Sequence, residues 1–258
     1  MSIAAGLYYF AHEAENFSRP PVILIHGAGG HHLYWPPQVR RLHNQRIFAV
    51  DLPGHGKSGG IGHHTIDDYA GEILEFMKAL RLNAAVLVGH SMGGAIALEV
   101  AIRYPKRVLG LGLVGSGARL RVAPVILQSA SGPSTFADAA HMINAYSYAP
   151  QTNARLKELG EQRMLETRST ILYGDLLACD SFDVMDRLSK ISAPTLILCG
   201  AEDKMTPLKN SEFMRDHIAG ARLEIVPNAG HNVMLEQPNQ VAEILADFLD
   251  AIPYRPGQ

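Results

Sequence analysis

Short apolar runs recur along the first half of this chain, and longer amphipathic stretches separate them. A run of aliphatic and β-branched residues without a polar position is typical of a strand buried on both faces of a parallel sheet. The expected strands are Val22–Ile25, Ile47–Val50, Ala85–Val88 and Leu109–Val114, with an edge strand within residues 6–12 before them.

The stretches between these strands predict helices. Apolar residues recur every three or four positions from Tyr69 to Leu80, and Thr65 precedes them as an N-cap, with two aspartates in the first turn. A shorter helix is expected over residues 35–43, with two prolines in its first turn. This alternation of strand and helix predicts a parallel sheet with right-handed crossovers.

The alternation stops after Val114. No strand-like run follows until residue 195, and helical stretches are expected over residues 123–129, 136–145, 153–166 and 171–178. The segment is too long for a loop without structure of its own. Residues 116–191 are therefore expected to form a helical cap (lid), and residues 1–115 and 192–258 to form the core.

The strand and helix pattern then resumes to the end of the chain. Strands are expected over 195–199 and 222–226, a helix over 208–218 between them, and a final helix whose apolar face runs from Val241 to Leu249. The sequence thus predicts the α/β class: a mostly parallel central sheet flanked by helices, with a helical cap inserted between two strands.

Composition narrows the function. The chain has 258 residues, 47% hydrophobic and 19% charged, as expected for a globular protein with a large core. A net charge of -2 with scattered basic residues argues against nucleic acid or a membrane as partner. Residues 1–15 lack the features of a secretory signal, and the two cysteines lack metal-ligand spacing, so a cytoplasmic location is expected. Assembly into a homo-oligomer stays open.

Ser91 lies between the third buried run and a predicted buried helix, with Gly89 and Gly93 two residues away on either side. This Gly-x-Ser-x-Gly pattern is typical of a nucleophile elbow. The strand and helix pass so close at such a turn that bulky side chains at the two glycine positions would clash. A glycine-rich turn that happens to hold a serine is the competing interpretation.

Polar residues at the ends of later strands favour the elbow. Asp203 follows the strand that ends at residue 199, and His231 follows the strand that ends at residue 226. In a parallel sheet the carboxyl ends of the strands share one edge. A serine nucleophile needs a base, and the base needs a carboxylate to orient it. Glu202, next to Asp203, is the alternative acid.

Four separated motifs together resemble the α/β-hydrolase-fold superfamily of serine hydrolases over essentially the whole chain. They are the His-Gly loop at residues 26–30, the Asp-Leu-Pro-Gly-His-Gly-Lys-Ser loop at 51–58, the Gly-His-Ser-Met-Gly-Gly elbow, and the spaced Asp and Gly-His near the C-terminus. The resemblance implies that Ser91 is the nucleophile, Asp203 the triad acid and His231 the general base.

An oxyanion hole needs two backbone donors. One is the N–H of Met92, directly after the nucleophile. The resemblance to His-Gly-x motifs implies the N–H of Ala28 as the second, with Gly27 or Gly29 as alternatives. Further substrate contacts are expected from Gly27, Leu33, Met142 and Met234.

The resemblance implies hydrolysis of a small carboxylic ester or related acyl compound through an acyl-enzyme on Ser91, without a cofactor or metal. A serine at the elbow argues against the haloalkane dehalogenases and epoxide hydrolases, which place an aspartate there. Thioesterase, lactonase and C–C bond hydrolase activity stay open, although many C–C hydrolases carry a bulky aromatic residue where this chain has Gly230. A triad-bearing small-molecule receptor and a cofactor-free lyase are the non-hydrolytic alternatives.

Other polar residues have two interpretations each. Arg119 and Arg121 either hold a substrate carboxylate or lie as charges on the surface, and the surface interpretation is favoured. The histidine doublets at 31–32 and 63–64 are expected to be exposed loop residues rather than metal ligands. His26, with Asp51 and His55, is expected to brace the loops near the site.

Overall fold

The computed structural model describes residues 2–12 and 19–254. Residues 1 and 13–15, part of the segment considered for a signal sequence, lie outside the described residues. The described strands form one sheet in the order β1-β2-β4-β3-β5-β6-β7-β8, antiparallel for the first two pairs and parallel from β4 onward. The strands are β1 Ile3–Ala4, β2 Leu7–His12, β3 Pro21–Ile25, β4 Arg46–Val50, β5 Ala85–His90, β6 Val108–Val114, β7 Thr195–Gly200 and β8 Arg222–Val226.

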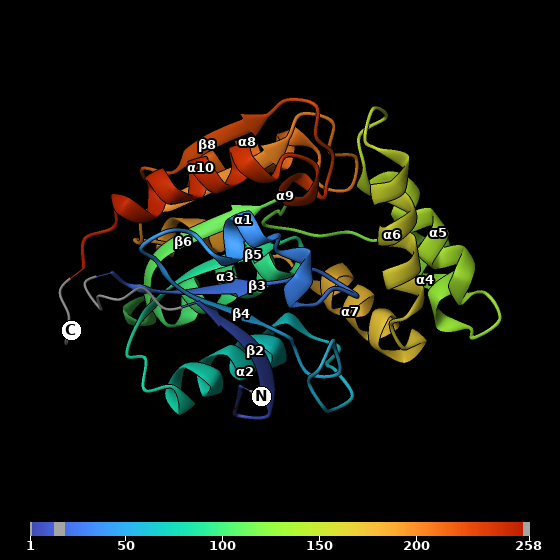
Figure 1. Cartoon of the computed structure of the whole chain (residues 1–258), viewed down its shortest axis with the longest axis horizontal. Helices are drawn as coiled ribbons and strands as arrows, with labels where there is room; N and C mark the ends of the chain where they lie inside the picture. The colour runs from blue at the N-terminus through green and yellow to red at the C-terminus, as the bar shows by residue number, and fades with distance from the viewer. Residues whose placement is uncertain (1, 13–18, 255–258) are drawn as a thin grey trace.

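Helices cover both faces of this sheet (Figure 1). Adjacent residues of β3 face opposite clusters: Ile23 and Ile25 pack with the face that carries α2 and α3, and Leu24 packs with the face that carries α10. This explains why the strand lacks polar positions. The α-helices outside the insertion are α1 Pro37–Arg40, α2 Ile66–Ala79, α3 Met92–Arg103, α8 Leu208–His217, α9 Val233–Glu236 and α10 Pro238–Asp250.

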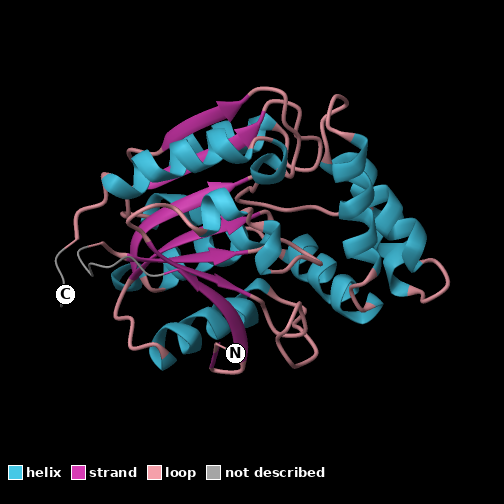
Figure 2. Cartoon of the chain, viewed as in Figure 1, coloured by secondary structure: helices cyan, strands magenta, loops and turns pink. Residues whose placement is uncertain are grey.

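Residues 116–191, which we call the helical insertion, lie between β6 and β7. Their α-helices lie beyond the carboxyl ends of the parallel strands (Figure 2). An antiparallel bridge between Arg119 and Asp183 joins the two ends of the insertion at its base. The insertion contains α4 Pro124–Ser131, α5 Phe136–Ser147, α6 Ala154–Leu165, α7 Ser169–Ser181 and the short 3-10 helix η3 Met185–Lys190.

The helix expected over residues 35–43 is wrong in extent. The structure has a 3-10 turn at His32–Tyr34 and then the four-residue α1. Trp35 and Pro36 each precede a proline, which disfavours helical dihedrals, and both are extended, with ψ of 113° and 161°. The helix therefore begins only at Pro37.

The register of the sheet decides which loops meet. Ile25 of β3 pairs with Gly89 of β5, so the loop after β3 begins beside the turn that holds Ser91. Gly200 of β7 pairs with Val226 of β8, so the loops after these strands are also neighbours.

No helix of the described residues is long and apolar enough to cross a bilayer.

Candidate active site

Ser91 occupies a strained turn between β5 and α3. Its φ of 52° and ψ of -116° lie outside the regions that residues other than glycine usually adopt. A Cβ at Gly89 would overlap the backbone of Gly93, and a Cβ at Gly93 would overlap the carbonyl oxygen of Ile25. The expected turn is therefore confirmed, together with the steric reason for its two glycines.

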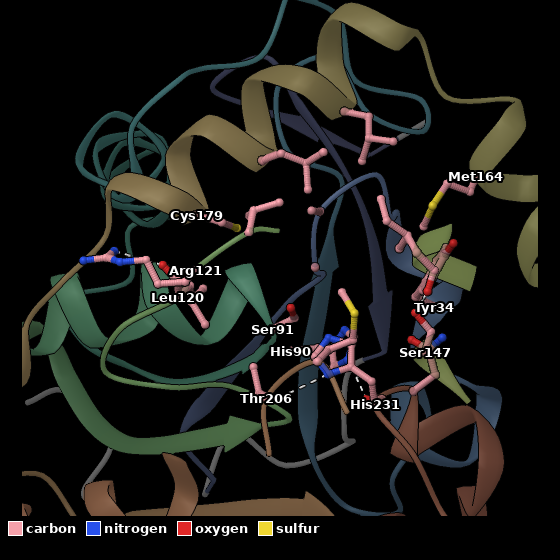
Figure 3. Close-up of a pocket in the computed structure, with 18 of the residues that line it drawn as sticks. Tyr34, His90, Ser91, Leu120, Arg121, Ser147, Met164, Cys179, Thr206 and His231 are labelled. Carbon is pink, nitrogen blue, oxygen red and sulfur yellow. Dashed lines mark hydrogen bonds between the residues drawn. The ribbon is translucent and has the colours of Figure 1, made fainter. Parts of the chain in front are cut away.

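Ser91 and His231 border the same cavity, which has a volume of about 100 Å³ (Figure 3). The cavity lies between the strand ends and the helical insertion. Its polar side carries Thr206, Asn210 and Asn232 from the core. The insertion contributes a largely apolar wall that includes Leu120, Val122, Ile143, Met164, Leu172, Leu176 and Cys179.

Asp203 orients the His231 ring. The Nδ1 of His231 donates to Asp203 Oδ2 at 2.9 Å, which leaves Nε2 as the ring nitrogen available to the cavity. The Oδ1 of Asp203 accepts from the N–H groups of Met205 and Thr206 at 2.9 and 2.8 Å. Burial raises the pKa of Asp203, but the charge and hydrogen bond of His231 and the Thr206 donors outweigh it and hold the pKa below its ordinary value.

The neighbouring acid does not share this position. Glu202 is half-buried, and its carboxylate accepts from the side-chain amide of Gln151. Asp203 is 6% exposed and is the one of the two acids that contacts His231. The geometry therefore favours Asp203 over the alternative acid.

The loop after β3, residues 26–30, forms a tight turn beside Ser91; we call it the β3 loop. The N–H of Gly30 donates to Gly27 O at 3.0 Å, and Gly29 has a positive φ of 64°. His26 braces the turn, because its Nδ1 donates to Gly27 O at 2.8 Å while its Nε2 accepts from Leu52 N–H at 3.0 Å. Burial lowers the pKa of His26 to about 3, which keeps the ring neutral.

Two backbone N–H groups near Ser91 have no acceptor among the residues that the structure describes. Within the described ranges no residue accepts a hydrogen bond from the N–H of Ala28. Met92 begins α3, where the first N–H groups have no partner inside the helix. Gly27 and Ala28 border the cavity, whereas the side chain of Met92 is buried in the core.

Asp175 of α7 is a buried acid that the sequence reasoning missed. Its Oδ2 accepts from Gly29 N–H at 2.8 Å and from His55 Nε2 at 2.7 Å, and its Oδ1 accepts from the Tyr69 hydroxyl at 2.5 Å. Burial lowers the pKa of His55, but the charge and hydrogen bond of Asp175 raise it above its ordinary value. The signal available in the sequence for this buried acid was a single acidic residue within the apolar stretch 171–178.

Glu236 of α9 also joins the insertion to a loop of the site. Its carboxylate accepts from Gly230 N–H and from Ala149 N–H, each at 2.9 Å, and from the Thr152 hydroxyl. A Cβ at Gly230 would lie 2.7 Å from the backbone nitrogen of Ala149. The backbone after α5 thus leaves no room for an aromatic side chain at this position.

Three expected substrate contacts are not brought to the cavity. Met234 is fully buried among the side chains between the sheet and α10, because the chain turns into α9 directly after His231. Leu33 is 39% exposed and borders a separate surface hollow. Met142 packs against the apolar cluster inside the insertion. For Leu33 and Met234, closeness in sequence to an expected site residue did not place the side chain at the cavity.

The two arginines at the base of the insertion, Arg119 and Arg121, pair with acidic and carbonyl groups of the same region. Arg121 donates to Asp180 O at 2.6 Å and pairs with Asp183 at 3.4 Å, and Arg119 pairs with the same carboxylate at 3.8 Å. Both border the cavity, but the side chain of Arg121 points away from Ser91 (Figure 3). The surface-charge interpretation is the better supported of the two.

One histidine doublet is not the exposed pair that we expected. His32 is 5% exposed, and ligand atoms of His31, His32 and Asp51 lie within 4.8 Å of one another. The oxygens of Asp51 are already occupied, since they accept from His32 N–H, His32 Nδ1 and Lys57 N–H at 2.6, 2.8 and 2.9 Å. This carboxylate braces its loop, and the donor set does not fit a metal ion.

Comparisons with known proteins relate the whole chain to one family. A model described as the alpha/beta hydrolase family matches residues 22–244. The 3-oxoadipate enol-lactonase 1 of Acinetobacter baylyi is 28% identical over 242 residues, covering 90% of this chain and 90% of that protein. A solved thermophilic esterase is 33% identical with a TM-score of 0.81, covering 95% of this chain and 98% of its own. The enol-lactonase of Burkholderia xenovorans LB400 has a TM-score of 0.88 at 23% identity over 95% and 96% of the two chains, a likeness of fold.

Proposed function

This chain belongs to the alpha/beta hydrolase family and is a hydrolase, and from that premise we propose that it cleaves small carboxylic esters through an acyl-enzyme on Ser91. The observation that carries the proposal is the cavity shared by Ser91 and His231, with Asp203 bonded to the far side of the histidine ring. A nucleophile, a base and an orienting acid are the parts that acyl transfer requires.

In the proposed mechanism His231 takes the proton of Ser91 as the hydroxyl attacks the ester carbonyl. Asp203 holds the ring with Nε2 toward the cavity and stabilises the imidazolium that forms. The same ring then protonates the leaving alcohol. After the alcohol departs, His231 activates a water that releases the acid from Ser91.

The developing negative charge on the substrate oxygen would be held by the N–H groups of Ala28 and Met92. Both are free of protein acceptors within the described ranges, and the α3 N-terminus adds a favourable dipole. Donors fixed before the reaction stabilise the transition state without reorganising.

The cavity supports a small substrate. Its volume of about 100 Å³ is bounded on one side by the apolar side chains of the insertion. The thermophilic esterase and the enol-lactonase among the relatives support esters, including internal esters, as the substrate class. The lack of room at Gly230 further disfavours the C–C hydrolase alternative.

We also propose that residues 116–191 act as a cap over the core. Side chains from α5, α6 and α7 form much of the cavity wall, so the insertion would set substrate size and exclude water.

The two buried free thiols support the expected cytoplasmic location.

A chain-length series tests the proposed substrate. We expect kcat/KM to be highest for p-nitrophenyl acetate to butyrate and at least about tenfold lower for the octanoate, because the apolar wall closes the cavity. Initial rates followed at the nitrophenolate absorbance measure this. Absence of steady turnover on every ester and lactone tested would contradict the function, and a preference for the octanoate would contradict the size argument.

Ala28→Pro tests the proposed oxyanion donor. Ala28 is the second residue of the turn closed by Gly30, a position that suits proline, so the change removes the N–H while keeping the turn. We expect kcat to fall roughly 100- to 1,000-fold. Ala28→Gly, which keeps the N–H, is the comparison variant and should lose far less. Equal losses in the two variants would argue against a donor role.

A further inference from the structure

Asp175 is a buried acid for which the proposed chemistry has no step. It stands on α7 of the helical insertion, has no exposed surface, and lies 146 positions from Gly29 in the sequence. An ionised carboxylate is tolerated in such a place only when its oxygens are paired. His55 and Tyr69 supply two of the three bonds, and the third reaches the β3 loop beside Ser91.

The insertion holds both polar backbone groups of Gly29. Its N–H donates to Asp175 at 2.8 Å, and its carbonyl accepts from the hydroxyl of Thr167 at 3.0 Å. Thr167 lies two positions before α7, so both contacts come from the same part of the insertion. The peptide planes on either side of Gly29 are thereby fixed from outside the core.

The β3 loop needs such support. Three of its five residues are glycines, and Gly29 has a positive φ of 64° in the turn. Glycine adopts positive and negative φ about equally well, so the sequence alone does not hold the turn in one shape. The other end of the loop is held by bonds within it, where His26 and Gly30 donate to Gly27 O, and by the core, where the N–H of Leu52 donates to His26.

The fixed peptides adjoin the proposed oxyanion donor. The Gly29 N–H bonded to Asp175 belongs to the peptide directly after the one that carries the Ala28 N–H. If the peptide between Ala28 and Gly29 rotated, the neighbouring peptide would move with it and the Ala28 N–H would change direction. A displacement of about 1 Å in a catalytic group can cost on the order of 100-fold in rate.

We propose that Asp175 is a positioning residue for catalysis: from the helical insertion it holds the β3 loop in the shape that aims the Ala28 N–H at the substrate oxygen, with Thr167 as a second support. This inference rests on the proposed function. The insertion then takes part in transition-state stabilisation, in addition to roofing the cavity.

The test compares Asp175→Ala with Tyr69→Phe on p-nitrophenyl acetate. Asp175→Ala removes the acceptor of Gly29 N–H, whereas Tyr69→Phe removes one bond to Asp175 and leaves the Gly29 contact in place. For Asp175→Ala we expect kcat to fall roughly 10- to 100-fold with KM changed by less than about threefold. Affinity for a trifluoromethyl ketone, whose adduct places an oxyanion in the site, should fall by the same factor.

A merely structural role predicts a different result. Tyr69→Phe should then lose as much kcat as Asp175→Ala, and that result, or an unchanged kcat in folded Asp175→Ala, would overturn the inference. If Asp175→Ala does not fold, Thr167→Val decides: a loss of about 3- to 10-fold in kcat and in ketone affinity supports positioning, and unchanged values refute it. A wild type without Ser91-dependent turnover would instead refute the proposed function itself.

Discussion

Ser91→Ala is expected to lower kcat on p-nitrophenyl acetate by on the order of a million-fold, because no other group at the turn can form the acyl-enzyme. The folded state should persist, since alanine fits the same turn and no described residue receives a hydrogen bond from the Ser91 hydroxyl. Initial rates at high enzyme concentration, with thermal unfolding followed by circular dichroism, measure both effects.

Covalent labelling gives the same test a chemical readout. A fluorophosphonate should form one adduct on Ser91 of the folded protein, located by mass spectrometry of the digested chain. Ser131→Ala, a change at an exposed serine of α4, serves as the control and should label normally. Residual turnover within tenfold of the wild type in Ser91→Ala, or an adduct on another residue, would show that the nucleophile is wrongly assigned.

Asp203→Asn is expected to lower kcat by about 10,000-fold while leaving the shape of the site nearly unchanged. The carboxylate oxygen Oδ2 accepts from both His231 Nδ1 and the Thr206 hydroxyl. An amide in its place can turn its NH₂ group toward the ring, which favours the tautomer with the proton on Nε2 and removes the base. Values of kcat measured across pH 5 to 9 would reveal the loss.

Glu202→Gln is the matched control for this change. It makes the same carboxylate-to-amide substitution at the adjacent residue, which contacts Gln151 and not His231. We expect its kcat to stay within about twofold of the wild type, since it alters an exposed contact. A large loss of kcat in Glu202→Gln together with a mild loss in Asp203→Asn would show that Glu202, and not Asp203, is the triad acid.

The local sequence pattern was enough to predict those features that depend on residues adjacent in the chain. The unbroken apolar run at residues 22–25 marked a strand buried on both faces, and the structure confirms it. The glycines at 89 and 93 marked a turn whose sterics exclude a Cβ, and that turn is also confirmed. In contrast, Pro36 and Pro37 fixed the start of α1 through the residues before them, a local effect that the sequence reasoning overlooked.

Contacts between distant segments could not be predicted in the same way. Met234 stands three positions from His231, yet it faces the core under α10 rather than the cavity. His32 was expected in a polar loop and is instead buried against Asp51. In both cases the direction of the side chain depends on how loops pack against the sheet, which no periodicity encodes.

The sequence by itself determined the order of the elements, the strained turn at Ser91 and the order of polar residues at the strand ends, because steric limits and burial act on neighbouring positions. Only the tertiary structure decided which groups meet at the site. Asp175 holds the loop beside Ser91 through a contact that spans 146 positions of the chain. Glu236 holds Gly230 beside His231 and joins it to Ala149 of the insertion, 87 positions away. Such contacts form when separate segments pack together, and a buried acid finds its partners only then.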